Sequence, residues 1–321
     1  MVFALFRLPD VALEEVIKKF NPKEILFLTQ TSLRARRLIS RHRKSYSVEI
    51  EVNDELYGSF VEISSDHRET FIIHMKTRRR GFNTSWRFQR VVAVRYEGDS
   101  LVSRWKRKDT AVQEILDFLM EFFRIKQISF RFQGSIDTRS AVPIVENCIS
   151  KNLKIENVEW PDRVSCKIAK RVLEASKSAS NLNIEFESCS TIRFNDFHLF
   201  RMDQLEIWNV MWMTVENILA LRNCKRIELR CVRLDESSIN KILLELMENP
   251  GELQVVRLDT YKEGFKMEEV VKGLNVVRID EGDNWRRQTY WLTGNNGIQL
   301  SVTKATRRII VIERETSIRM E

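Results

Sequence analysis

Apolar residues recur at steps of three and four positions near the start of the chain. Leu13, Val16, Ile17 and Phe20 follow this spacing, and residues so spaced lie along one stripe of an α-helix. The pair Leu8-Pro9 precedes the stripe, and a residue before proline favours extended backbone. The pattern therefore predicts an extended lead-in followed by a short helix.

Two more short helices are predicted before residue 40. Asn21-Pro22 combines a favourable N-cap with a proline at the first helical position, so a second helix begins there and carries Ile25 and Leu28. Thr31-Ser32 can cap a third, arginine-rich helix from Leu33 to Ile39. Three short helices in about forty residues cannot bury three apolar faces among themselves. We therefore expect this module to need a partner surface.

From residue 47 to residue 94 apolar and polar residues alternate. Val48, Ile50 and Val52 set the pattern, and two later runs repeat it. A period of two predicts antiparallel strands with one face in water. A helix with a wide apolar face follows near residue 110, and Asp109 or Thr110 is its expected N-cap.

Beyond residue 125 short apolar triplets recur at steps of 21 to 29 residues. They begin at Ile128, Leu153, Leu182, Leu205, Ile227, Val256 and Val277. Helical stretches lie between them, at residues 142–149, 168–175, 215–221 and 239–247. One strand and one helix in each unit is the arrangement of leucine-rich repeats, in which stacked neighbours bury a continuous core. Because the repeats are irregular and lack the usual asparagine after the strand, we expect a domain that is only leucine-rich-repeat-like.

In such a sheet the residues between the buried positions point to solvent. These positions supply the candidate substrate-binding residues Glu185, Glu206, Trp208, Glu228, Arg230 and Arg257. Trp208 is the most informative of them, because tryptophan is a frequent anchor of protein interfaces. The alternative is that Trp208 packs under a C-terminal loop. Trp160 and Trp212, which occupy the position of Leu234 in its repeat, are expected in the core.

The C-terminal part returns to alternation. Tyr290-Trp291-Leu292, a turn at residues 294–297 and the alternating run from Ile298 predict antiparallel strands. A hairpin here is expected to cover the last open edge of the repeat sheet.

The first forty residues resemble an F-box in their order of Leu8-Pro9, apolar helix, Asn21-Pro22 turn, Thr31-Ser32 and basic helix. The departures are Val11-Ala12, where acidic or aliphatic residues are common, and the lack of a tryptophan after the Thr-Ser pair. The resemblance implies docking on a Skp-type adaptor and, through it, on a cullin-RING ubiquitin ligase. The residues expected to bind the adaptor are Leu8, Pro9, Leu13, Val16, Ile17, Pro22, Ile25 and Leu28. The alternative is an ordinary helical N-terminal lobe.

The order of parts after residue 45 resembles the type 2 F-box-associated proteins that are expanded in nematodes. The resemblance implies a substrate-recognition domain. The expected fold class is α/β (α+β overall), with an F-box at residues 1–45, a strand meander and connecting helix at residues 46–125, and the leucine-rich-repeat-like domain at residues 126–321.

Charge and cysteine content narrow the function. Residues 1–110 hold 22 Lys and Arg against 14 Asp and Glu, a net of +8, and residues 111–321 hold 31 of each sign. The basic clusters at residues 34–44, 76–80 and 104–108 could follow a phosphate backbone, but a solvated helix face and two strand turns explain them better. Five cysteines without a Cys-x-x-Cys pair argue against a disulfide framework and a zinc site, and favour a reducing compartment.

No catalytic pattern is present. The four histidines are scattered, and no nucleophile elbow, phosphate-binding glycine loop or His-Glu-x-x-His occurs. We therefore expect no catalytic residue, no metal site and no cofactor. No apolar run is long enough to cross a membrane, and the short segment Met1 to Leu8 lacks the pattern of a signal peptide.

The sequence thus predicts a non-enzymatic substrate adaptor of a Skp–cullin–F-box ubiquitin ligase, acting inside the cell in the cytoplasm, the nucleus or both. Its expected partners are a Skp-type protein and an unidentified substrate protein, with no membrane. The alternative is a protein-binding scaffold without ligase function, or a nucleic-acid-binding protein that uses the basic N-terminal third.

Overall fold

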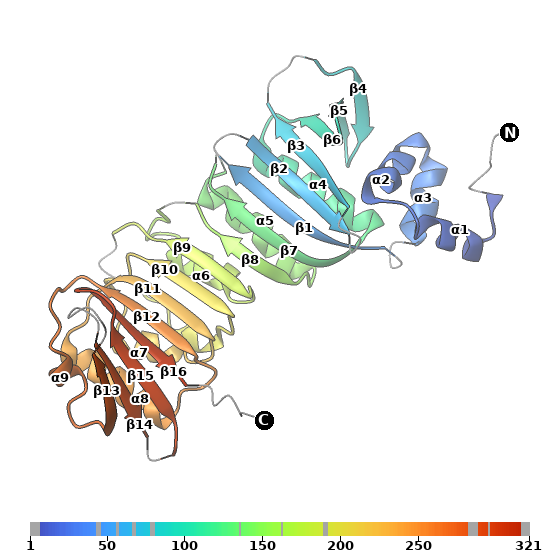
Figure 1. Ribbon diagram of the computed structural model, residues 1–321. Helices are drawn as coiled ribbons and strands as arrows, with labels where there is room; N and C mark the ends of the chain where they lie inside the picture. Colours follow the sequence, from blue (N-terminus) through green and yellow to red (C-terminus); the bar gives the residue numbers. More distant parts are fainter. Residues whose placement is uncertain are drawn as a thin grey trace. The chain divides into compact units, whose positions relative to one another are not determined.

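The computed structural model describes residues 7–42, 46–55, 58–65, 69–77, 81–134, 136–161, 163–188, 192–281, 288–294 and 296–315. The chain forms two compact units, Met1–Pro161 and Asp162–Glu321 (Figure 1). Arg78, Arg79 and Arg80 of the second basic cluster lie outside the described residues, as do His67, Cys189 and Asn295.

Unit 1 begins with the helices α1 (Asp10–Ile17), α2 (Pro22–Thr31) and α3 (Leu33–Arg41). The two predicted caps are confirmed. The Asn21 side chain accepts a hydrogen bond from the Glu24 amide at 2.8 Å, and the Glu24 carboxylate accepts one from the Asn21 amide at 2.9 Å, which is a capping box. The Ser32 hydroxyl accepts from the Ala35 amide at 3.1 Å.

The sheet of unit 1 has the strand order β8-β7-β1-β2-β3-β6-β5-β4. Its strands are β1 (Ser47–Glu55), β2 (Gly58–Ser65), β3 (Thr70–Lys76), β4 (Thr84–Arg87), β5 (Val91–Glu97), β6 (Ser100–Arg104), β7 (Arg124–Phe132) and β8 (Ile155–Glu159). The meander is not wholly antiparallel, because β3 pairs in parallel with β6 and β1 pairs in parallel with β7. The β4–β5 hairpin therefore extends the sheet beyond β6 and does not follow β3 directly.

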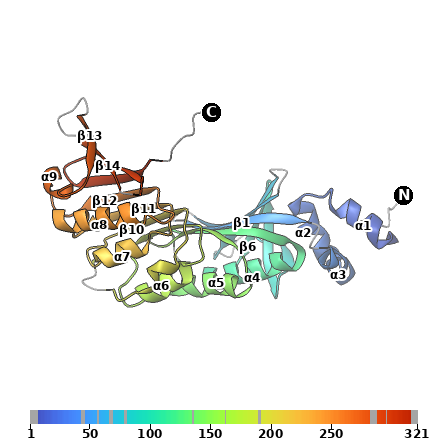
Figure 2. The same ribbon diagram turned by 90° about the horizontal axis from the view of Figure 1, so that it is seen from below.

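Two helices, α4 (Lys108–Phe122) and α5 (Thr138–Ser150), cover one face of this sheet (Figure 2). The predicted capping of α4 by Asp109 or Thr110 is wrong, since the helix begins at Lys108 with Arg107 as an N-cap that makes no side-chain cap. The Asp109 carboxylate instead accepts from the Arg107 guanidinium.

The sheet of unit 2 has the strand order β13-β14-β15-β16-β12-β11-β10-β9. Its elements in chain order are α6 (Ala169–Ser176), β9 (Asn181–Glu185), the 3-10 helix η3 (Asp196–Leu199), β10 (Gln204–Trp208), α7 (Val215–Ala220), β11 (Arg226–Val232), α8 (Glu236–Glu248), β12 (Val255–Thr260), α9 (Met267–Val270), β13 (Val276–Glu281), β14 (Gln288–Thr293), β15 (Gln299–Lys304) and β16 (Ile309–Arg314).

The four parallel strands β9 to β12 bring the predicted repeat positions into register. Leu182 pairs with Leu205, Leu205 with Ile227, and Ile227 with Val256, and all four are buried on the face that the helices cover. This alternation of parallel strand and helix is what the repeats predicted.

The seventh repeat does not continue the stack. β16 pairs antiparallel with β12 and so covers the predicted open edge, which leaves β13 at the far end of the sheet beyond β14 and β15. The side chains of Val277 and Ile279 on β13 are 59% and 50% exposed. The triplet that begins at Val277 therefore forms a strand, but not a repeat of the parallel series.

Cysteine use departs from the prediction in one place. Cys166 is disulfide-bonded. Cys148, Cys224 and Cys231 are free. The odd number and the spacing of the cysteines argued against disulfides, but neither determines which thiols meet in space.

The predicted core tryptophans are confirmed. Trp160 is 3% exposed and Trp212 is 8% exposed.

Candidate interaction surfaces

The eight predicted adaptor-binding residues fall into two groups. Leu13, Ile17, Pro22 and Ile25 are buried within the chain, whereas Leu8, Val16 and Leu28 are half-buried and Pro9 is exposed. Only the second group presents apolar surface to a partner in this conformation.

Two exposed apolar side chains of the same module were missed in the sequence. Val11 in α1 is 77% exposed and Leu33 at the start of α3 is 56% exposed. Both lie off the periodic stripes, and a position off the stripe is the signal that indicates an outward side chain. They belong with Pro9, Leu8, Val16 and Leu28 to the apolar surface of the three helices.

Helix α2 buries part of its surface against the strands of unit 1. The ring of Phe27 lies 4.9 Å from the ring of Tyr96 and 5.5 Å from that of Trp86, and the Trp86 indole donates to the Tyr96 hydroxyl at 2.8 Å. Burial raises the pKa of Tyr96. The expectation that the three helices need another apolar surface is thus met in part by the chain itself.

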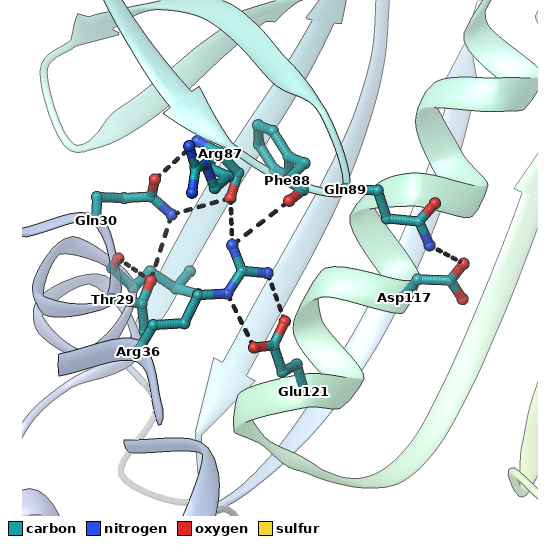
Figure 3. A network of polar contacts seen from close by, with 9 residues as sticks. Thr29, Gln30, Arg36, Arg87, Phe88, Gln89, Asp117 and Glu121 are labelled. Atoms are coloured by element: carbon teal, nitrogen blue, oxygen red, sulfur yellow. Dashed lines mark hydrogen bonds and ion pairs between the residues drawn. The ribbon is translucent and has the colours of Figure 1, made fainter. Parts of the chain in front are cut away.

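Helix α3 is joined to α4 by a network around Arg36 (Figure 3). The Arg36 guanidinium donates to the Glu121 carboxylate at 2.8 Å and to the carbonyl oxygens of Arg87 and Phe88 at 3.0 and 3.4 Å. Its central carbon lies 5.4 Å from the ring centre of Phe118, in cation–π geometry. Arg36 therefore belongs to a half-buried junction and not to a free basic surface.

The other basic clusters are partly paired as well. Arg107 forms an ion pair with Asp109, and the Lys108 ammonium lies 3.5 Å from the fully buried Asp54 carboxylate. Arg34 and Arg37 are exposed. The described residues therefore place only a part of the predicted positive charge on an open surface.

In unit 2 the open face of β10, β11 and β12 gathers five of the six predicted substrate-binding residues. The Arg230 guanidinium carbon lies 3.8 Å from the ring centre of Trp208, and the guanidinium pairs with Glu206 at 3.0 Å and with Glu228 at 2.9 Å. The Trp208 indole donates to Glu206 at 2.7 Å, and Arg257 reaches Glu228 at 3.5 Å.

The sixth predicted residue, Glu185, joins the same face through a neighbour. The Asn209 side chain donates to the Glu185 carboxylate at 3.2 Å and to the Phe186 carbonyl at 2.8 Å. Asn209 has a φ of 60°, a left-handed conformation that asparagine tolerates better than most residues. The turn after β10 thus fixes Glu185 beside Trp208, its register partner.

Trp208 is half-buried, but the residue that packs on it is not in a C-terminal loop, which was the alternative derived from the sequence. One ring face lies under Arg230 from the neighbouring strand, not under a C-terminal loop. Trp208 faces outward, as predicted, and the Arg230 guanidinium of the same chain stacks on its ring.

A second arrangement of the same chemistry was missed. The Arg278 guanidinium carbon lies 4.6 Å from the ring centre of Trp291, the Trp291 indole donates to Asp280 at 2.7 Å, and Arg278 pairs with Asp280 at 2.9 Å. Trp291 lies between the buried Tyr290 and Leu292, so alternation alone would have placed it outward.

Two of the free cysteines are buried. Burial raises the pKa of Cys148 to about 12 and that of Cys224 to about 11, so both thiols stay protonated at neutral pH. Within the described ranges, no three residues among His, Cys, Asp and Glu gather closely enough to hold a metal ion. None of the described helices is long and apolar enough to cross a membrane.

Comparison with known proteins agrees with the N-terminal geometry. Residues 5–45 match the family model of the F-box domain, so the chain contains an F-box domain, a module that generally serves as an adaptor in ubiquitin ligases. The chain is also similar to the Skn-1 dependent zygotic transcript 15 protein of Caenorhabditis elegans, with 25% identity over 315 residues that cover 92% of this chain and 88% of that one. No solved structure matches the chain.

Proposed function

We propose that the chain is a substrate-recognition adaptor of a Skp–cullin–F-box ubiquitin ligase. The observation that carries the proposal is the F-box match at residues 5–45, which coincides with three helices that leave apolar side chains in water. On this proposal the protein acts inside the cell, in the cytoplasm, the nucleus or both.

The adaptor surface consists of six of the incompletely buried apolar residues of the F-box. They are Leu8, Pro9, Val11, Val16, Leu28 and Leu33. An interface depends on a few apolar anchors that a partner desolvates, and exposed side chains are the ones available for this. Leu13, Ile17, Pro22 and Ile25 act from beneath, because they hold the helices in the arrangement that presents the anchors.

The substrate surface is the open face of unit 2, around Glu185, Glu206, Trp208, Glu228, Arg230 and Arg257. The face offers an aromatic ring, two arginines and several carboxylates on neighbouring strands. Such a mixture gives specificity through complementary charge and shape, and it needs no chemistry of its own. Side chains fixed by mutual contacts also lose less conformational freedom when a substrate binds.

The mechanism is proximity. The F-box holds the chain to a Skp-type protein while the open face of unit 2 holds a substrate, so that ubiquitin transfer by other subunits becomes effectively intramolecular. Tethering of this kind raises the local concentration of the substrate to about the millimolar range when the geometry allows it. The chain itself is then neither an enzyme nor a cofactor-binding protein.

The test is a binding measurement between the full chain and a Skp-type protein. The double variant Leu8→Ala/Pro9→Ala should weaken binding about thirtyfold, since truncating interface anchors costs ~2 kcal/mol or more. The matched control, Val277→Ala/Ile279→Ala, removes exposed apolar surface from unit 2 and should leave the affinity unchanged. Undiminished binding by a folded Leu8/Pro9 variant would refute the adaptor role of the F-box.

The alternative of nucleic-acid binding by the basic N-terminal third gains less support. Arg36, Arg107 and Lys108 are already paired with carboxylates. Salt distinguishes the two functions, because phosphate binding weakens steeply as salt rises and apolar docking hardly changes. A complex with the Skp-type protein that persists from low to high salt supports the adaptor function.

A further inference from the structure

Among the described residues of unit 1, no helix covers one of the two faces of the sheet. Helices α4 and α5 lie against the opposite face (Figure 2). Val48, Ile50 and Val52 of β1 are buried, which places their side chains on the helix-covered face. Successive side chains of a strand alternate between faces, so Glu49 and Glu51 point away from the helices. We call this the open face of unit 1.

Carboxylates dominate one half of the open face. Glu49, Glu51 and Glu55 come from β1, Glu62 from β2 and Glu159 from β8. The Arg131 guanidinium on β7 lies 3.6 Å from Glu51, 4.0 Å from Glu55 and 3.2 Å from Glu159. A single positive charge is thus shared among three negative ones, and this half of the face keeps an excess of negative charge.

Two of the carboxylates oppose each other directly. Glu51 and Glu62 are register partners on the antiparallel strands β1 and β2. Like charges at such positions destabilise a sheet. Partial burial, together with the Glu51 charge, raises the pKa of Glu62. The repulsion is a cost that a positive ligand would relieve.

The other half of the open face holds an apolar and aromatic patch, with Lys76 at its border near the end of β3. Phe60 on β2 and His74 on β3 are register partners, with ring centres 5.8 Å apart, and Ile72 pairs with Glu62. All three apolar or aromatic side chains are half-buried at outward positions. The face therefore combines negative charge with an apolar patch on adjacent strands, and it is more than a group of acidic residues.

The open face of unit 1 carries carboxylates, although the N-terminal third of the chain is basic overall. Residues 1–110 carry a net charge of +8, yet Glu49, Glu51, Glu55 and Glu62 from this stretch share one face. A basic protein does not attract cations at long range, so any binding of a cationic segment has to come from local contacts.

We propose that the open face of unit 1 binds a segment of a partner protein that carries lysine or arginine next to apolar residues. The cations reach the carboxylates of β1 and β2, and the apolar side chains reach Phe60 and Ile72. Phosphate groups would meet repulsion at the same place. The site is formed by unit 1, whereas the proposed substrate face belongs to unit 2, and the inference holds whether or not the chain serves a ligase.

The dimensions suit a short segment. Adjacent strands are ~4.8 Å apart, so the five strands from β8 to β3 span roughly 19 Å, the length of about six extended residues. A fluorescein-labelled peptide of alternating lysine and alanine, roughly a dozen residues long, is therefore a sufficient probe for the full chain, with alternating glutamate and alanine as its counterpart.

The experiment measures fluorescence anisotropy at low salt. The lysine peptide should bind the chain and the glutamate peptide should not. The triple variant Glu49→Gln/Glu51→Gln/Glu62→Gln should bind the lysine peptide about tenfold more weakly, since exposed ion pairs contribute ~0.5 kcal/mol each. The matched control Glu245→Gln/Glu248→Gln/Glu252→Gln changes the net charge equally at exposed residues of α8 and the following turn, and should keep the affinity.

Three results would overturn the proposal. The first is an unchanged affinity of the Glu49/Glu51/Glu62 variant for the lysine peptide, and the second is an equal loss in the control variant. The third is a glutamate peptide that binds the wild-type chain as tightly as the lysine peptide does, because the site would then not select cations. Circular dichroism of each variant verifies the fold, which the removal of the Glu51–Glu62 repulsion should not harm.

Discussion

The contact between Trp208 and Arg230 shows how a single residue of the proposed substrate face is held in place. The indole has its nitrogen bonded to Glu206 and one ring face under Arg230, although it points away from the helices. A stacked guanidinium fixes the ring and lowers the entropy lost on binding. In the proposed function, Trp208 is therefore an anchor that is already oriented before a substrate arrives.

Substituting this face and the core beneath it should separate surface from interior. Leu205→Ala removes a fully buried side chain and should lower the free energy of unfolding by about 2–5 kcal/mol. Trp208→Ala should cost less, ~1 kcal/mol, because the ring is half exposed. Denaturant unfolding checks both, and equal losses would assign Trp208 to the core.

The raised pKa of Glu62 has a consequence for stability. A carboxyl whose folded pKa exceeds its unfolded one binds more protons in the folded state, so its contribution to stability falls as pH rises through that range. Glu62→Gln should therefore stabilise the chain at pH 7 relative to wild type and have no effect well below the ordinary glutamate pKa. Solvent screens this half-buried group, which keeps the effect within ~0.5 kcal/mol. Thermal melting of both proteins at the two pH values measures it, and a gain at low pH alone would contradict the assignment.

At the scale of elements, helix α3 is held to α4 by a charged pair whose members are 85 positions apart in sequence. Because the side chain of Arg36 is only 15% exposed, its interaction with Glu121 is less screened than a surface pair. A double-mutant cycle with Arg36→Ala and Glu121→Ala should give a coupling energy of about 1 kcal/mol. Additive losses would show that the two residues act independently. The surface pair Lys241 and Glu216 is a matched control, with an expected coupling close to zero.

Local signals in the sequence predicted the elements well where local physics decides them. Asn21 and Ser32 cap their helices as expected, and the repeat positions of β9 to β12 fall in register. The sequence did not predict which strands far apart in the chain pair with each other. Nothing in the alternation around β3 or β13 distinguishes a parallel neighbour from an antiparallel one, or a repeat strand from an edge strand.

For the candidate sites, too, the sequence predicted the face on which a residue lies but not the residues that contact it. Alternation placed the six substrate-face residues on one side of the sheet, and the structure puts them there. It gave no hint that Arg230 lies on Trp208, because rotamers depend on neighbours from other strands. In the F-box the stripe residues Leu13 and Ile17 turned out buried, since periodicity identifies an apolar face without saying whether the chain or a partner covers it.

At the scale of the whole molecule, the F-box is part of the packing of unit 1 and not an appendage. Removing residues 1–45 would expose the buried Trp86 and Phe118 and would free the side of the Tyr96 ring that now stacks on Phe27. We expect the truncated chain to melt roughly 10 °C lower, because 1 kcal/mol shifts a unit of this size by about 2–4 °C and several buried contacts are lost. Calorimetry checks this, and an unchanged melting temperature would show an independent F-box. The Leu8→Ala/Pro9→Ala chain, whose F-box stays in place, is the control.

The contact between α3 and α4 can form only after α4 has been synthesised, well after α3. A ribosome adds about 5–20 residues per second, so the 85 residues that separate Arg36 from Glu121 take roughly 4–17 s to synthesise. For that interval α2 and α3 have been made, while the aromatic side chains and the carboxylate that will cover them have not all emerged. During synthesis the apolar surfaces of α2 and α3 therefore stay exposed to solvent until the strands of unit 1 and helix α4 have left the ribosome. In that interval chaperones or an early partner protein can bind these surfaces.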